Sequence, residues 1–181
     1  MQRDVNKSPN GKNLLKPIII YGLIILVLGC AQCAFFPLLD FCPKTPDLIL
    51  GMLLAITLLK DEKSAAVCAI AAGFFLDAVG SSTLSLSPLR YFLFVALIAP
   101  LAKKVLKSFA SYMLLLIPAL LYRAAASYIC ACIAYRSVCG VWIIEEILIP
   151  EAIVTAVLCL PIYFIVKLCT HTLDTHSRFT F

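Results

Sequence analysis

Long apolar runs separated by short charged segments make up most of this chain. The runs cover residues 17–39, 46–59, 64–80, 88–102, 108–135 and 139–169. A helix of about 20 apolar residues crosses the hydrocarbon core of a bilayer, and the first, fifth and sixth runs reach that length. In lipid, helices satisfy their own backbone hydrogen bonds. The pattern therefore predicts an all-α, polytopic transmembrane bundle of about six helices.

The second, third and fourth runs are short, and the second has a well-marked start. Thr45 is expected to be the N-cap, Pro46 the first helical residue, and Asp47 an anion that the helix dipole favours. The charged turn 60–63 ends this run. A re-entrant hairpin would leave that turn inside the membrane at a high energetic cost. Short helices that each cross the membrane completely are therefore favoured over a re-entrant hairpin. In the longer runs, Pro118, Pro150 and Pro161 are expected to introduce kinks.

Composition supports a membrane protein. Hydrophobic residues make up 62% of the 181 residues, charged residues only 14%, and the mean hydropathy is +1.01, whereas a soluble domain of this size carries more charge. If the N-terminus is cytoplasmic and the chain crosses the membrane six times, most cations lie on the cytoplasmic side. These are Arg3, Lys7, Lys12, Lys16, Lys60, Lys63, Lys103, Lys104, Lys107, Lys167 and Arg178. Only Lys44, Arg90 and Arg136 would lie outside. The positive-inside rule then predicts that both termini are cytoplasmic, the tails being residues 1–16 and 170–181.

The remaining chemistry gives little sign of catalysis. No zincin, nucleophile-elbow, P-loop or dinucleotide motif is present in the sequence. Cys30 and Cys33 form a C-x-x-C inside an apolar run, where cysteine is expected to act as a small hydrophobe. His171 and His176 lie in the predicted C-terminal tail. We expect no enzyme activity, no cofactor, no metal and no nucleic-acid partner, since a basic stripe is also missing.

Charged residues inside the predicted spans need partners. Asp77 follows Gly73, Ala69 and Ala65 at steps of four residues, a small-residue stripe that permits close helix approach. Asp77 is therefore expected to face the bundle. Arg90, at the start of the next run, is its expected partner. The pair would either fix two helices together or contribute to a ligand or partner site.

Arg123 lies in the middle of the fifth run, with Ala119 and Ser127 on the same helical face. If the last two helices form a hairpin with its tip near residue 137, Arg123 and Glu151 lie at one depth. An Arg123–Glu151 ion pair is therefore predicted. If the stretch 141–149 lies along the outer interface instead, Arg123 would need Glu145, Glu146 or Asp77.

The second to fourth runs resemble a known family. The residues are Thr45-Pro46-Asp47-Leu48, then Gly73-Phe74-Phe75-Leu76-Asp77-Ala78-Val79-Gly80, then Leu89-Arg90-Tyr91-Phe92-Leu93. They resemble the rod shape-determining protein MreD family over about 50 residues, although Ser85 stands where that family often has Gly. The resemblance implies a fold similar to the substrate-binding subunits of energy-coupling-factor transporters. It also implies a location in the bacterial inner membrane and no enzymatic activity. The implied partners are an MreC-like periplasmic protein, an MreB-like filament, and RodA with its transpeptidase.

Two functions follow as hypotheses. The first is a non-catalytic scaffold of the cell-elongation machinery, supporting lateral peptidoglycan synthesis, whose outer loops (40–45, 80–88 and 136–141) dock the periplasmic partner. Its structural or partner-binding residues would be Asp47, Gly73, Asp77, Arg90, Arg123 and Glu151. The second is the substrate-binding subunit of a vitamin or small-solute transporter, in which Asp77, Arg90, Arg123 and Glu151 would line an outward-facing cavity. An open chamber around these charges would favour the second.

Overall fold

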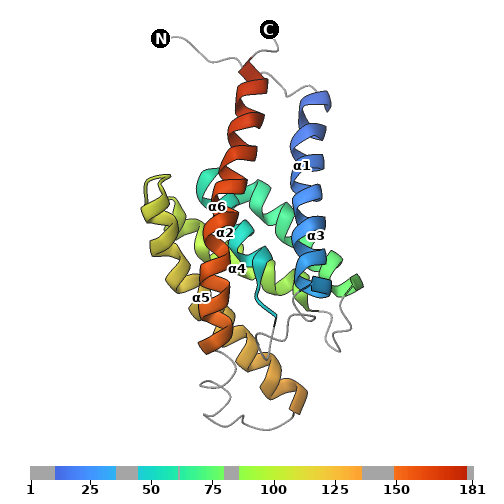
Figure 1. Ribbon diagram of the computed structural model, residues 1–181, viewed down its shortest axis with the longest axis vertical. Coiled ribbons are helices and arrows are strands. Elements are labelled where there is room, and N and C mark those ends of the chain that lie inside the picture. The colour runs from blue at the N-terminus through green and yellow to red at the C-terminus, as the bar shows by residue number, and fades with distance from the viewer. Residues whose placement is uncertain (1–10, 36–44, 61, 80–85, 136–148, 179–181) are drawn as a thin grey trace.

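The computed structural model describes residues 11–35, 45–60, 62–79, 86–135 and 149–178, and these are helical almost throughout. The elements are α1 (Gly11–Cys30), a π-helical segment η1 (Ala31–Phe35), α2 (Leu48–Leu59), α3 (Glu62–Val79), α4 (Ser87–Ala102), α5 (Phe109–Tyr135) and α6 (Ile149–Arg178). The predicted all-helical class is confirmed. The start of α1 and the end of α6 lie at the same end of the molecule, marked N and C in Figure 1.

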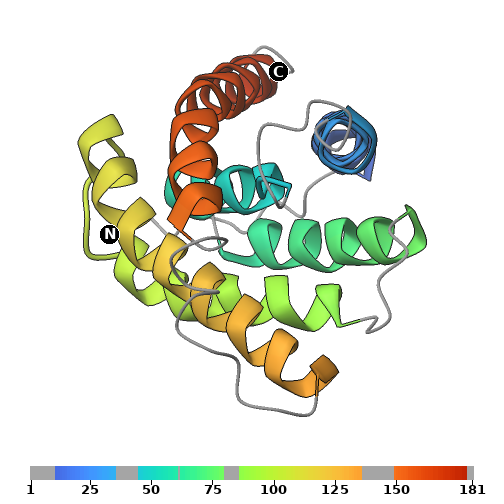
Figure 2. The same cartoon turned by 60° about the horizontal axis from the view of Figure 1, so that its bottom comes forward.

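Helix α2 is the core of the bundle. It contacts every other α-helix, and each residue from Leu48 to Leu58 is buried. The other helices surround it, with α3 and α4 on one side and α6 on another (Figure 2). The sequence of α2 is apolar on all faces, and a helix of this kind is expected to be buried on every side.

Helices α3 and α4 form an antiparallel hairpin held by small residues. The stripe Ala65, Ala69 and Gly73 is buried, as predicted. A Cβ at Gly73 would collide with the backbone of Pro88. Glycine is therefore needed at this position because the two backbones approach too closely for any side chain. At the other end of the hairpin, Lys103 forms an ion pair with Glu62 at 2.6 Å.

The helix bounds differ from the expected ones at several points. Asp47, and not Thr45, is the N-cap of α2, and its carboxylate accepts a hydrogen bond from the backbone N–H of Leu50 at 3.1 Å. Helix α1 begins at Gly11, inside the predicted tail. Pro150 is the second residue of α6, so the predicted kink there is wrong: at a helix start proline removes no intrahelical hydrogen bond. The predicted interfacial stretch falls almost entirely at 141–148, outside the described residues.

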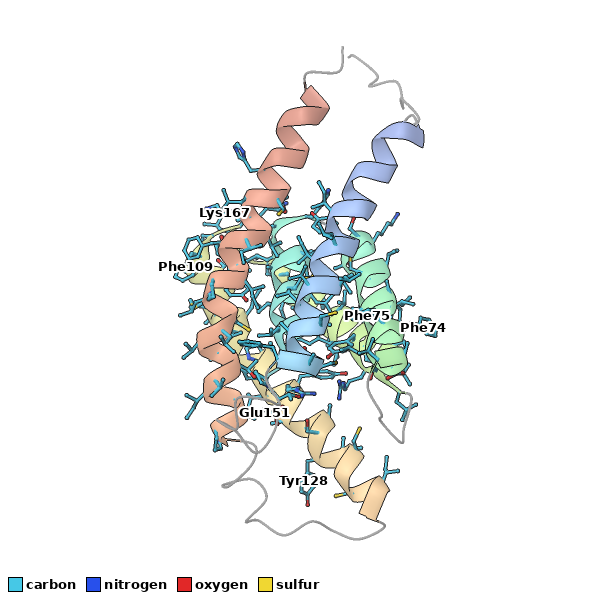
Figure 3. The ribbon with its side chains drawn as sticks, turned by 45° about the vertical axis from the view of Figure 1, so that its right-hand side comes forward. Phe74, Phe75, Phe109, Tyr128, Glu151 and Lys167 are labelled. Carbon is cyan, nitrogen blue, oxygen red and sulfur yellow. The ribbon has the colours of Figure 1, made fainter. Side chains whose placement is uncertain are left out.

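The outer surface of the bundle carries many exposed hydrophobic side chains. Large hydrophobic side chains are exposed on every described α-helix except α2, among them Leu23, Phe74, Leu97, Leu114 and Leu168. Figure 3 shows Phe74 pointing away from the bundle. Two segments, Phe109–Cys130 and Pro150–His171, are long and apolar enough to cross a membrane, and three shorter apolar helices accompany them.

Candidate functional site: a buried ion network at the start of α2

The start of α2 is surrounded by charged and polar side chains from four other elements. Asp47 is completely buried. Besides capping α2, its carboxylate accepts hydrogen bonds from the Tyr91 hydroxyl at 2.9 Å (Oδ1) and 3.0 Å (Oδ2). Arg123 Nε lies 3.2 Å from Asp47 Oδ2. The Asp47 carboxylate thus accepts hydrogen bonds from the Leu50 N–H and the Tyr91 hydroxyl and forms an ion pair with Arg123, and these partners offset the cost of burying its charge.

Arg123 connects two acidic side chains. Its NH2 group lies 2.7 Å from Glu151 Oε1, so the predicted Arg123–Glu151 pair is present. The Arg123 side chain is 14% exposed and that of Glu151 only 3%. Glu151 lies where the first turn of α6 approaches α5 (Figure 3). The second partner, Asp47, was not among the alternatives that the sequence suggested.

Arg90 brings a second cation to the network through Tyr91. The Arg90 guanidinium lies 5.0 Å from the centre of the Tyr91 ring, and its NH2 group is 3.4 Å from the Tyr91 hydroxyl. The Arg90 carbonyl accepts a hydrogen bond from the Tyr122 hydroxyl at 2.6 Å. The network thus contains two carboxylates, Asp47 and Glu151, and two guanidinium groups, so the formal charges balance. Arg123 contacts both carboxylates directly, whereas Arg90 contacts Tyr91.

The backbone entering α2 is also satisfied by side chains. The N–H of Asp47 donates to Thr155 Oγ1 at 3.3 Å, and the N–H of Leu48 donates to Gln32 Oε1 at 3.2 Å. Gln32 belongs to the π-helical segment η1, a distortion that often occurs at functional sites. The first N–H groups of a helix have no intrahelical partner, so these side chains fix where α2 begins.

The predicted Asp77–Arg90 pair is wrong. No ion pair joins these two described residues, and the enclosed Oδ1 of Asp77 lacks a hydrogen-bond partner within the described part of the chain. The contact of Gly73 with Pro88 explains why. From that contact Asp77 lies four residues further along α3 and Arg90 two residues further along the antiparallel α4, so they are separated by about 9 Å along the axis at 1.5 Å per residue.

The structure therefore brings together Asp47, Arg90, Arg123 and Glu151, while Gly73 serves the α3–α4 contact and Asp77 lacks its expected partner. Tyr91, Gln32 and Thr155 were missed. The spacing of the sequence could have indicated Tyr91. Tyr91 precedes Lys103 by about as many residues as Asp47 precedes Lys60, so the two residues lie at a similar distance from their lysines along α4 and α2. Glu145 and Glu146, the alternative partners of Arg123, lie outside the described residues.

The described residues contain no group of His, Cys, Asp and Glu side chains that could hold a metal ion. The network can neutralise charge and fix helices, but it presents no nucleophile paired with a base. Comparisons with known proteins found no matching family model, no matching curated protein and no matching solved structure. The fold and the site thus define an all-helical protein with a buried ion network, and the MreD resemblance stays a prediction.

Proposed function

We propose that this chain is a non-catalytic, six-span membrane scaffold of the MreD type, which holds a partner protein of the bacterial cell-elongation machinery. The observation that carries the proposal is the buried network of Asp47, Arg123, Glu151 and Arg90. It joins α2, α4, α5 and α6 and leaves Arg123 paired rather than free for a ligand.

Depth supports the membrane part of the proposal. At 1.5 Å per residue, the 13 residues from Asp47 to Lys60 place these two residues about 20 Å apart along α2. By the same count Arg123 lies about 24 Å from Lys107, and Glu151 lies about 24 Å from Lys167. A hydrocarbon core is about 30 Å thick. If the lysines mark the cytoplasmic surface, the charged network lies inside the membrane, where its mutual pairing is required.

The apolar exterior supports the same placement. Exposed hydrophobic side chains on α1, α3, α4, α5 and α6 would make a water-soluble monomer prone to association, but they suit contact with lipid. Four described lysines, Lys60, Lys63, Lys103 and Lys107, lie together at the end of α2, and the positive-inside rule would make that end cytoplasmic. The outer loops proposed for docking an MreC-like protein fall almost wholly outside the described residues.

The experiment that tests the scaffold combines depletion with rescue. Depleting the protein in its native cells should produce round cells, and a tagged wild-type copy purified in mild detergent should bring MreC-like and RodA-like proteins with it. Leu121→Met, an exposed change on α5, should restore rod shape, whereas Arg123→Met should not. Rod-shaped cells after full depletion, or co-purification of an ATPase pair instead, would contradict the proposal.

A second candidate, the solute-binding transporter subunit, is favoured by one observation. Five side-chain atoms are enclosed and have no hydrogen-bond partner in the described ranges: Asp77 Oδ1, Arg90 Nε, Arg123 Nε, Glu151 Oε2 and the Tyr163 hydroxyl. Unpaired polar atoms suit a ligand. If a solute binds there, Asp77→Asn should abolish uptake of that solute while the protein remains as stable as wild type.

A further inference from the structure

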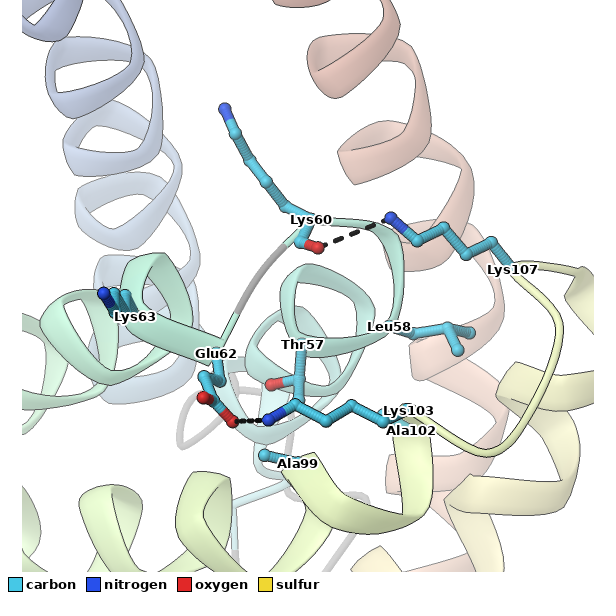
Figure 4. Close-up of a pocket in the computed structure, with 9 residues that line it drawn as sticks. All are labelled: Thr57, Leu58, Lys60, Glu62, Lys63, Ala99, Ala102, Lys103 and Lys107. Atoms are coloured by element: carbon cyan, nitrogen blue, oxygen red, sulfur yellow. Dashed lines mark hydrogen bonds and ion pairs between the residues drawn. The ribbon is translucent and has the colours of Figure 1, made fainter. Parts of the chain in front are cut away.

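Two adjoining cavities lie at the end of α2, opposite the ion network. The first, of about 250 Å³, is shown in Figure 4 and lies among the turns that follow α2 and α4. Its lining residues are Thr57, Leu58, Lys60, Glu62, Lys63, Ala99, Ala102, Lys103 and Lys107. The second, of about 400 Å³, lies between α3 and α4. Its lining residues are Glu62, Lys63, Ala66, Phe92, Val95, Ala96, Ala99, Pro100 and Lys103.

The first cavity is strongly basic. Four lysines and one glutamate line it, which gives a formal charge of +3. Two of the lysines are already engaged: Lys103 with Glu62, and Lys107, whose Nζ donates to the Leu59 carbonyl at 2.9 Å. Lys60 points toward α1, where its Nζ lies 5.4 Å from the Tyr21 ring centre. Lys63 makes no hydrogen bond or ion pair with any described residue.

The second cavity is mostly apolar and continues from the first. Lys63, Glu62, Ala99 and Lys103 line both cavities. Beyond these shared residues the second cavity is bounded by hydrocarbon side chains, including the small Ala66 and Ala96 that leave a groove between α3 and α4. A basic mouth thus opens directly into an apolar groove along the outer surface of the bundle.

We propose that these joined cavities bind one anionic phospholipid, with its phosphate at Lys63, beside the Lys103–Glu62 ion pair, and an acyl chain along the α3–α4 groove. The proposal rests on the membrane insertion proposed above, but not on the scaffold role. The excess positive charge selects an anionic headgroup, as basic clusters near a membrane surface do. The groove selects a lipid over a free phosphate, because a free phosphate has no apolar part to occupy it.

Native mass spectrometry of detergent-solubilised protein, titrated with phosphatidylglycerol or phosphatidylcholine of the same chain length, tests this site. We expect phosphatidylglycerol to bind more tightly. Lys63→Gln should weaken that binding about fivefold, in line with the contribution of one lysine near an anionic surface. Lys104→Gln is the matched control, because Lys104 neighbours Lys103 and is exposed but lines neither cavity. Equal loss in both variants would overturn the site in favour of general surface attraction.

The groove is tested separately. Ala96→Trp should fill it and weaken phosphatidylglycerol binding, whereas Leu93→Trp, an exposed change on α4 outside the groove, should not. Glycerol phosphate, which has no acyl chain, should not compete at concentrations that saturate the lipid. Competition by glycerol phosphate, or full binding by Ala96→Trp, would contradict a lipid site. Resistance of the wild-type protein to carbonate extraction from membranes, measured in parallel, separates failed insertion from failed lipid binding.

Discussion

At its start α2 meets Asp47, Arg123 and Glu151 in the interior of the bundle, whereas at its end it meets lysines that are largely exposed. The interior charges are held at 2.7 and 3.2 Å by side chains from different helices. The exposed Lys103–Glu62 pair has a similar distance, 2.6 Å, but both side chains are about half exposed or more. Distance alone therefore does not tell which ion pair contributes more to stability, because water competes for the charges at the end of α2 and not at its start.

The difference assigns separate roles to the two ends. Charges that cannot reach water must keep their partners, so the start of α2 fixes the arrangement of four helices. Charges in contact with water can exchange partners at little cost, so the lysines at the end of α2 are available for binding. Substitutions at the two ends of α2 and in the helices around it can break or sharpen this contrast.

Arg123→Met should destabilise the protein by about 3–5 kcal/mol, because it leaves Asp47 and Glu151 buried without a cation. Thermal unfolding in mild detergent, followed by a thiol-reactive dye at the buried cysteines, measures the change. Leu121→Met, two residues earlier and exposed, is the control and should unfold like wild type. An unfolding temperature for Arg123→Met equal to that of the control would show that the network contributes nothing.

Tyr91→Phe should cost about 1.5–3 kcal/mol, since its hydroxyl donates to the buried, charged Asp47. Tyr112→Phe is the comparison: that hydroxyl donates to the neutral carbonyl of Cys159 at 3.0 Å, and its loss should cost about 0.5–1.5 kcal/mol. The same unfolding assay ranks the two. A larger effect at Tyr112 would argue against a charged Asp47.

Gly73→Ala should destabilise by about 1–3 kcal/mol, because the new methyl group collides with the Pro88 backbone and forces α3 and α4 apart. Gly22→Ala in α1 has open space around the new methyl group and should gain about 0.5–1 kcal/mol from helix propensity. Opposite signs for the two substitutions are the expected result. Stabilisation by Gly73→Ala would mean that the hairpin packs less closely than described.

Lys103→Gln should change stability by less than about 1 kcal/mol, although it removes an ion pair as short as the buried one. Its effect should also shrink further in high salt, because exposed charges are screened. Unfolding at low and high ionic strength measures both. A loss comparable to that of Arg123→Met would remove the contrast between the two ends.

The sequence predicted the helical class, the small-residue face of α3 and the Arg123–Glu151 pair, because each depends on periodicity or on equal spacing from a turn. It placed the N-cap of α2 two residues early, since Thr45 and Asp47 both have a capping side chain. Asp47 as a partner of Arg123 was missed because the sequence pattern indicated only its place at the start of α2, where the helix dipole favours an anion, and not how that start packs against α5. In the structure α2 is a 12-residue helix, so its start is buried.

The Asp77–Arg90 pair failed for a related reason. Sequence spacing gives the position of a residue along its own helix but not the axial offset between two packed helices. Here that offset is set by the contact of Gly73 with Pro88, which only the packed structure reveals. The lysine-lined cavities likewise depend on how the turns after α2 and α4 meet.

A double-mutant cycle between Arg123 and Glu151 tests most directly whether buried charges are stable here only because neighbouring helices neutralise them. The measurement compares the unfolding free energies of Arg123→Met, Glu151→Met and the double variant with wild type. We expect the double variant to be less destabilised than the sum of the single variants, by about 1–3 kcal/mol. Additive effects would contradict the account, because they would mean that neither side chain needs the other.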